Sequence, residues 1–166
     1  MKHLEEIAAA GLAPPSVNQL EVRALPPRSG AGSRARTQIH PLCQQRPIVA
    51  YCRKHGIVNE AYCPLLHGAL AQPEFDAIAA KHGRSTAQVL LRWSLQSGFA
   101  FPSPLWSVLT AARRFVPLPK SVTPARIAAN TALFDFVLDT KDMRTLDALD
   151  RGAAGAVLDW QPTEAP

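Results

Sequence analysis

The sequence has few cysteines and no long apolar run, and each shortage excludes a class of protein. Its 166 residues include three cysteines, an odd number without CxxC spacing, which argues against a disulfide framework or a thiolate zinc site. No apolar run approaches the roughly 20 residues of a membrane span, and the first residues lack the apolar core of a signal peptide. We therefore expect a cytoplasmic protein without a metal site, in which Cys43, Cys52 and Cys63 are reduced thiols that pack as small apolar groups.

Acidic residues are missing from two segments, 23–39 and 100–115. The first is rich in Pro, Gly, Ser and Arg, which predicts a mobile loop, and the second is largely apolar. Together they hold six arginines, one more than the net charge of +5, so the rest of the chain is not basic. We therefore expect no nucleic-acid partner. A nucleic-acid module built on the arginines of the first segment remains an alternative, which salt-dependent DNA binding would support.

Hydrophobic residues make up 47% of the chain, and their spacing predicts a folded alternation of strands and helices rather than disorder. Gly11, Gly56 and Gly83 are read as helix stops, and Ser85 with Gln88 as a capping box. The expected strands are Ser16–Val22, Ile57–Tyr62 and a buried Val116–Leu118, and the expected helices are Leu4–Ala10, Gln44–His55, Pro73–His82 and Ser85–Ser97.

The stretch 116–130 combines a strand, a polar turn and a helix start within a few residues. Thr123 is read as the N-cap of the helix, and a proline follows it at the first helical position. Lys120, Ser121 and Arg126 then surround unpaired backbone N–H groups, which is what a phosphate group requires. From the residue types alone, a phosphate site and an ordinary strand-to-helix turn with solvated basic residues are both open.

The amino-acid sequence of the same stretch resembles that of a known family. The run 116–130, followed by Phe134-Asp-Phe-x-Leu138 and by Asp142-Met-x-x-Leu-Asp-x-Leu149, is similar to the last strand and helices of the aldo-keto reductases. The resemblance implies an α/β fold, a (β/α)8 TIM barrel, and NADPH-dependent reduction of a small-molecule carbonyl substrate. A complete barrel typically needs about 250 residues. The chain is therefore expected to be a partial barrel, the last three strands with their helices.

The resemblance assigns residues 1–150 to the C-terminal half of such a barrel and 151–166 to a tail. It also implies that the two segments without acidic residues are insertions. In the family, the residues on either side of each segment follow one another almost directly. We interpret them as translated introns or errors in the gene boundaries, a hypothesis that sequencing of the mature transcript decides.

The resemblance also implies a cofactor site. Lys120 and Arg126 are expected to hold the 2′-phosphate of NADPH, a role for which Arg offers a planar fork and Lys a point charge. Ala129 departs from the glutamate of many relatives, so one adenine contact is missing. The other residues carried over are Ser121 and Val122 at the adenosine end, Asn130 on the adenine, Gln19 on the nicotinamide carboxamide, Tyr62 stacked on the nicotinamide ring, and Cys63 and Leu65 along the pyrophosphate.

No catalytic residue is expected in this chain. The family uses a tyrosine acid with a lysine, an aspartate and a histidine from the first four strands, and none of the four has a counterpart here. Tyr51 and Tyr62 are the only tyrosines, and neither matches the motif of the acid. Trp160 in the tail is the candidate apolar contact for substrate, unless it is merely packed on the surface.

Two readings follow for the chain as a whole. One is a truncated oxidoreductase that keeps part of the NADPH site and is inactive alone. The alternative is a non-enzymatic half-barrel that self-associates, because three parallel strands leave two unpaired sheet edges.

Overall fold

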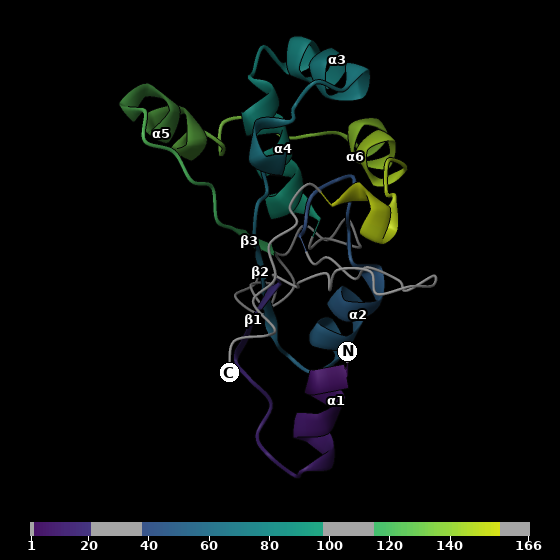
Figure 1. The fold of residues 1–166 in the computed structure, drawn as a ribbon. Helices are drawn as coiled ribbons and strands as arrows, with labels where there is room; N and C mark the ends of the chain where they lie inside the picture. Colours follow the sequence, from purple (N-terminus) through teal and green to yellow (C-terminus); the bar gives the residue numbers. More distant parts are fainter. Residues whose placement is uncertain (1, 21–37, 98–114, 157–166) are drawn as a thin grey trace, which may run out of the picture.

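Three short parallel strands form a sheet at the centre of the fold (Figure 1). The computed structural model describes residues 2–20, 38–97 and 115–156 of the chain. Strands β1 (Val17–Leu20), β2 (Val58–Ala61) and β3 (Phe115–Pro117) lie in that order. Leu20 is paired with Ala61, and Ala61 with Pro117, so the carboxyl ends of all three strands are level.

Helices follow the strands in the order that the sequence predicts. Ser85 and Gln88 form the expected capping box, in which the Gln88 N–H donates to Ser85 Oγ at 3.2 Å and Ser85 N–H to Gln88 Oε1 at 3.0 Å. No described helix is long and apolar enough to cross a membrane. The helices are α1 (Lys2–Ala9), α2 (Arg46–Lys54), η1 (Leu66–Gly68), α3 (Pro73–His82), α4 (Thr86–Gln96), α5 (Pro124–Thr131), α6 (Thr140–Asp147) and η3 (Gly152–Gly155).

The hydrophobic core lies between one face of the sheet and the helices α3, α4 and α6. Trp93 of α4 is 1% exposed, and its ring packs against Phe115 of β3 with centroids 6.1 Å apart. Such a tilted pair of rings adds to the free energy gained by burial of the apolar surface. The wider cluster contains Ile39, Val49, Ala61, Leu66, Phe75, Ile78, Val89, Leu90, Leu138 and Leu146.

The opposite face of the sheet is open within the described residues. Side chains alternate along a strand, so Asn59, Ala61 and Phe115 share the buried face, whereas Val17 and Val116 share the other. These two valines are 45% and 41% exposed. The expectation of a buried strand at Val116–Leu118 was therefore wrong for Val116, which points to the side where no described helix lies.

Three residues at the ends of the two predicted insertions are part of the described fold. Gln38 and Ile39 are buried, and the Ile39 N–H donates to the Tyr62 carbonyl at 3.5 Å. Phe115 is the first residue of β3 and is 4% exposed. These apolar ends belong to the core, and the rest of both segments lies outside the described residues.

The thiols follow the expectation in part. Cys43 and Cys52 are free and fully buried, and Cys63 is free and half-buried. Burial raises the pKa of both Cys43 and Cys52, which keeps these thiols protonated.

Candidate functional site

The residues predicted to bind the cofactor gather at the carboxyl edge of the sheet. Gln19 precedes the end of β1 by one residue and is paired with Glu60, and Tyr62 follows the end of β2. Lys120 lies three residues beyond β3, after the Leu118 N–H has bonded the Ala61 carbonyl at 3.1 Å. In parallel α/β folds ligands bind at this edge. The structure thus brings the two ends of the predicted site to one edge, although the side chain of Gln19 is outside the described set.

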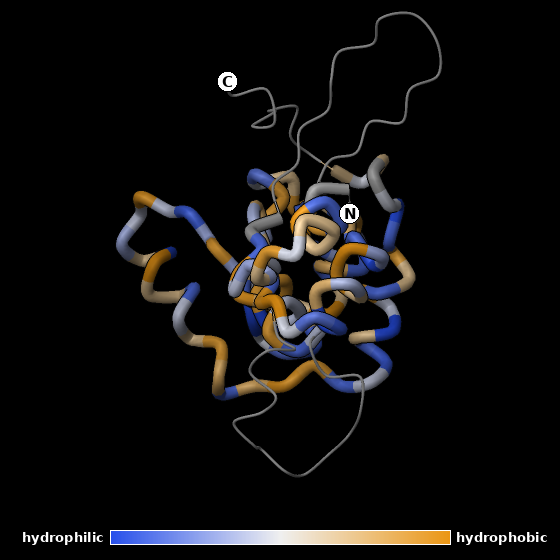
Figure 2. The backbone as a smooth tube through the Cα atoms, turned by 90° about the horizontal axis from the view of Figure 1, so that it is seen from below, coloured by the Kyte–Doolittle hydropathy of each residue, from blue (hydrophilic) through white to orange (hydrophobic). Residues whose placement is uncertain are grey.

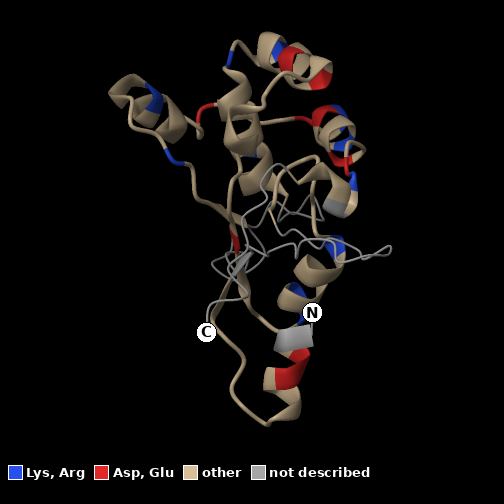
Figure 3. Cartoon of the chain, in the orientation of Figure 1, with Lys and Arg blue, Asp and Glu red and all other residues tan. Residues whose placement is uncertain are grey.

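Lys120 and Arg126 are both exposed and both without a partner in the described part of the chain. They are the only charged residues between β3 and the end of α5, so no carboxylate of that stretch neutralises them (Figure 3). Figures 1 and 2 show α5 and its connection to β3 at one side of the fold, where α5 packs against α4. The two cations are therefore available to an anion from solvent.

The turn before α5 differs from the expected cap. Thr123 stands at the N-cap position and Pro124 follows it, but the Thr123 side chain makes no capping bond. Instead the Thr123 N–H donates to Ser121 Oγ at 3.2 Å, and the Ile127 N–H is bonded to the Thr123 carbonyl at 3.0 Å. The predicted N-cap position of Thr123 and the proline after it are confirmed, but the turn is held by the Ser121 hydroxyl and not by a bond from the Thr123 side chain. The backbone N–H groups before Ile127 have no partner within the helix. Such groups bind anions at helix N-termini.

The remaining two adenosine-end candidates lie on either side of this turn. Val122 is 79% exposed, a high value for a valine, and Asn130 is half-buried in the last turn of α5. Both positions suit contact with a ligand laid across the turn, since neither side chain belongs to the hydrophobic core.

The segment after β2 has an unusual backbone. Cys63, Leu66 and His67 have φ angles of 52°, 49° and 54°, in the left-handed region that favours glycine. Residues held there cluster at ligand-binding sites, where the surrounding structure determines them. Tyr62 is half-buried beside this segment, while Leu65 packs against the core and has less side chain to offer a ligand.

The histidine next to this region is not available for chemistry. His40 is fully buried, and burial lowers its pKa to about 4, so it is neutral near pH 7. Its Nε2 lies 3.0 Å from Gln38 Oε1. In this structure the ring is therefore closed off from solvent.

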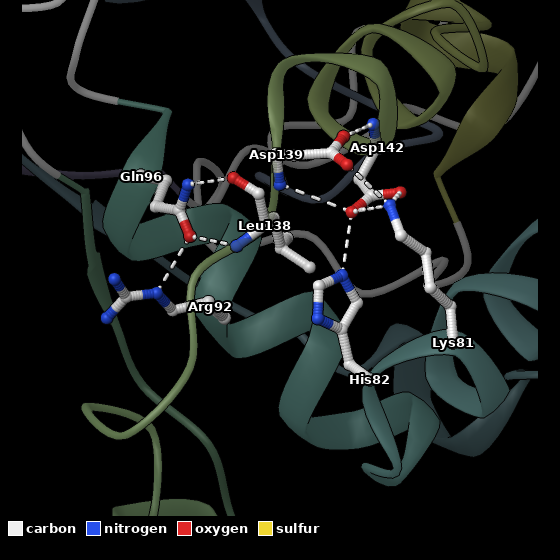
Figure 4. A network of polar contacts seen from close by, with 7 residues as sticks. All are labelled: Lys81, His82, Arg92, Gln96, Leu138, Asp139 and Asp142. Carbon is white, nitrogen blue, oxygen red and sulfur yellow. Dashed lines mark hydrogen bonds and ion pairs between the residues drawn. The ribbon is translucent and has the colours of Figure 1, made fainter.

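A polar cluster that sequence reasoning missed joins α3 to α6 (Figure 4). Asp142 is 4% exposed, and its carboxylate accepts a hydrogen bond from Lys81 Nζ at 2.8 Å. The other oxygen of this carboxylate lies 2.7 Å from His82 Nε2. Lys81 also bonds Asp139 at 2.6 Å, and Asp139 and Asp142 form a capping box at the start of α6. The Asp-x-x-Asp spacing signalled this box. The cluster fastens helices, and among the described residues no group of three or more His, Cys, Asp or Glu side chains could hold a metal.

Three parallel strands with their helices are consistent with part of a parallel α/β barrel, and comparison with known proteins shows the family of this chain. The profile of the aldo/keto reductase family matches residues 1–151, and this chain belongs to that family. It is 35% identical over 150 residues to glyoxal reductase of Bacillus subtilis and 36% identical over 163 residues to morphine 6-dehydrogenase of Pseudomonas putida. Each alignment covers 90% of this chain, but 42% and 44% of those relatives.

Solved structures agree with this assignment. A variant of the protein Gox0644, described as a complex with NADPH, superposes with a TM-score of 0.70 at 33% identity. The superposition covers 99% of this chain and 48% of that one. The predicted family and its cofactor NADPH are confirmed, and the sheet of three parallel strands is consistent with the predicted partial barrel. The family match begins at residue 1, and this chain spans less than half the length of the relatives it matches.

Proposed function

We propose that this chain forms the C-terminal half, with the last three strands, of an NADPH-dependent carbonyl-reductase barrel. In this proposal Lys120, Ser121 and Arg126 hold the adenosine end of the cofactor, with Val122 and Asn130 beside them. The observation that carries the proposal is that the two cations after β3 are exposed and have no partner among the described residues. A 2′-phosphate satisfies both charges, which favours NADPH over NADH.

The nicotinamide end of the same cofactor is assigned to the other two strands. Gln19 from β1 and Tyr62 after β2 would meet the ring, and Cys63 and Leu65 would line the pyrophosphate. The left-handed backbone at Cys63 supports this assignment, since it places a strained turn at the ligand edge. NADPH, when bound, supplies the hydride that reduces a small-molecule carbonyl.

The described residues supply binding without acid catalysis. No tyrosine of the chain matches the acid of the family, and His40 is buried and neutral. We therefore propose that the chain, with domain limits at 1–150 and a tail at 151–166, has no activity alone. It would act in the cytoplasm as part of a complete barrel. Trp160 in the tail, the candidate substrate contact, lies outside the described residues.

A second candidate function is supported by the open sheet face. Val17 and Val116 are exposed there, and β1 and β3 each have an edge without a described partner strand. Such edges invite pairing between copies, so a non-enzymatic, self-associating half-barrel is the alternative. Size-exclusion chromatography with light scattering distinguishes the two, because a monodisperse monomer with cooperative melting counts against self-association.

The proposal is tested by fluorescence titration of NADPH into the whole chain. Lys120→Ala and Arg126→Ala should each weaken NADPH binding about tenfold, the cost of one charge-assisted hydrogen bond, and weaken NADH binding little. Lys54→Ala is the control, because this exposed lysine ends α2 just before β2 begins, at the opposite edge of the sheet. Absence of NADPH binding by the parent chain would remove cofactor binding as a function of this chain.

A further inference from the structure

Within the described part of the chain, the helix that carries Arg126 and Asn130 contributes no residue to the hydrophobic core. None of the residues of α5 is buried, and Ile127, its largest apolar side chain, is 50% exposed. Within the described part of the chain, α5 packs against α4. Burial of apolar surface normally fixes a helix on its domain. In its absence, polar contacts from α4 must hold α5 in place.

Gln88 of α4 supplies those contacts at the end of α5. Its Nε2 donates to the carbonyl oxygens of Ala129 at 3.2 Å and of Ala132 at 3.0 Å. The Ala129 carbonyl also accepts from the N–H of Ala132, the C-cap residue of α5, at 3.2 Å. The Gln88 amide therefore binds the last turn of α5 and its C-cap together. Gln88 is buried, which shields the bonds from competing water.

The contact extends along one face of α4. Arg92 and Gln96 follow Gln88 at intervals of four residues, and residues so spaced lie above one another on a helix. Arg92 Nη1 donates to the Leu133 carbonyl at 3.0 Å, and Arg92 Nε donates to Gln96 Oε1 at 2.7 Å. Gln96 both donates to the Leu138 carbonyl and accepts from the Leu138 N–H, each at 2.9 Å (Figure 4). Side chains of α4 thus bind the backbone from α5 to the start of α6.

We infer that Gln88 is a positioning residue for the cofactor site: its amide fixes the end of α5 and, through that helix, the orientation of Arg126 and Asn130 toward the turn that holds Lys120. The inference rests on the proposed cofactor site. It assigns to Gln88 no contact with the cofactor itself.

The two ends of the Gln88 amide have separable roles. The Oε1 atom accepts from the Ser85 N–H at 3.0 Å and from the Ser85 hydroxyl at 3.1 Å, which caps α4. The Nε2 atom alone serves α5. Gln88→Glu therefore keeps the cap, which a carboxylate fills equally well near a helix N-terminus, and turns an oxygen toward two carbonyl oxygens.

The control is the same substitution at another buried glutamine. Gln44 Nε2 also donates to backbone carbonyls, those of Pro41 at 2.9 Å and Asp147 at 3.0 Å, and makes no contact with α5. Gln44→Glu therefore measures how the replacement of a buried amide by a carboxylate affects hydrogen exchange when the contact with α5 is kept.

The experiment is amide hydrogen exchange on the whole chain, read by mass spectrometry. In Gln88→Glu the amides of Ile127–Thr131 should exchange about tenfold faster, the effect expected for two lost hydrogen bonds, while α3 and α6 keep their protection. In Gln44→Glu the amides of α5 should be unchanged relative to the rest. Unchanged exchange of α5 in Gln88→Glu, or a rise shared equally with α3, would overturn the inference.

NADPH and NADH titrations complete the test. Gln88→Glu should reduce the preference for NADPH several-fold, whereas Gln44→Glu should leave the ratio of the two dissociation constants unchanged. An unchanged ratio in Gln88→Glu, with α5 loosened, would overturn the link from helix to cofactor. If the parent chain binds no NADPH, the proposed function fails, and the exchange experiment still decides whether Gln88 fixes α5.

Discussion

Two lysines of this chain have opposite surroundings. Lys81 is bonded to Asp139 and Asp142, and these bonds raise its pKa. Lys120 is exposed and has no partner in the described part of the chain. A lysine that is bound to carboxylates stabilises structure, whereas an unpaired one beside a helix N-terminus is free to bind an anion. The residue that the family resemblance singles out is the one that the fold leaves unpaired.

The buried carboxylate of Asp142 provides a test of the helix fastening. Asp142→Asn should lower the free energy of unfolding by about 2 kcal/mol, because bonds from Lys81 and His82 lose their charge assistance. Urea denaturation measures the change. Asp135→Asn is the matched control, since its pair with Arg84 involves a carboxylate that is 58% exposed and should cost less than about 1 kcal/mol. Equal losses in the two variants would contradict the structural role of Asp142.

The same cluster predicts how stability depends on pH. Burial alone would raise the pKa of Asp142, but hydrogen bonds from Lys81 and His82 outweigh it and hold the pKa below its ordinary value. The bond from Lys81 lowers the pKa of Asp139 to about 2. Carboxyls with a lowered folded-state pKa stabilise the fold above the ordinary value, about 4, and lose that effect as the pH falls towards about 2. Denaturation between those limits should show a shallower decline in Asp142→Asn than in the parent.

Single residues of the candidate site were predictable only where their role is local or matches a family motif. Lys120 and Arg126 were assigned to the predicted phosphate site from the family motif that contains them, and both are exposed. The contact of Gln88 with Ala129 was not predictable, because it joins residues 41 positions apart through backbone carbonyls that any sequence has. The exposure of Val116 escaped prediction for a related reason, since it depends on what covers the sheet.

At the scale of elements, helices with local signals matched their predicted limits most closely. The helix pair α3 and α4 is bounded by Gly83 in a left-handed conformation and by the capping box at Ser85, both readable in the sequence. Strand β2 is shorter than predicted and β3 begins one residue earlier than predicted, and Ile39 and Phe115 were assigned to the insertions. Their places depend on pairing and packing with distant residues, which periodicity in a single segment does not contain.

The two N-caps offer a contrast between elements. Ser85→Ala should lower the free energy of unfolding by about 1 kcal/mol, because the side-chain bond to the Gln88 N–H is lost. Thr123→Ala should cost less than half as much, because the Thr123 side chain makes no capping bond to α5. Thermal and urea denaturation of the two variants measure the difference. A larger loss in Thr123→Ala would show that the start of α5 depends on this hydroxyl.

At the scale of the whole molecule, the fold supplies a binding edge and leaves a face open. The three strands end at one level, and the described helices cover one side of their sheet. The chain spans 42% to 48% of the relatives named above, in agreement with a partial barrel.

The central claim, that Lys120 and Arg126 form a site for the 2′-phosphate, is tested most directly by calorimetric titration with 2′,5′-ADP and 5′-AMP. The two ligands share the adenosine and the 5′-phosphate and differ in the 2′-phosphate alone. The parent chain should bind 2′,5′-ADP at least about tenfold more tightly, a gap of about 1.4 kcal/mol, and Lys120→Ala should close most of it. Equal affinity for the two ligands, or a gap that survives in both Lys120→Ala and Arg126→Ala, would contradict the account.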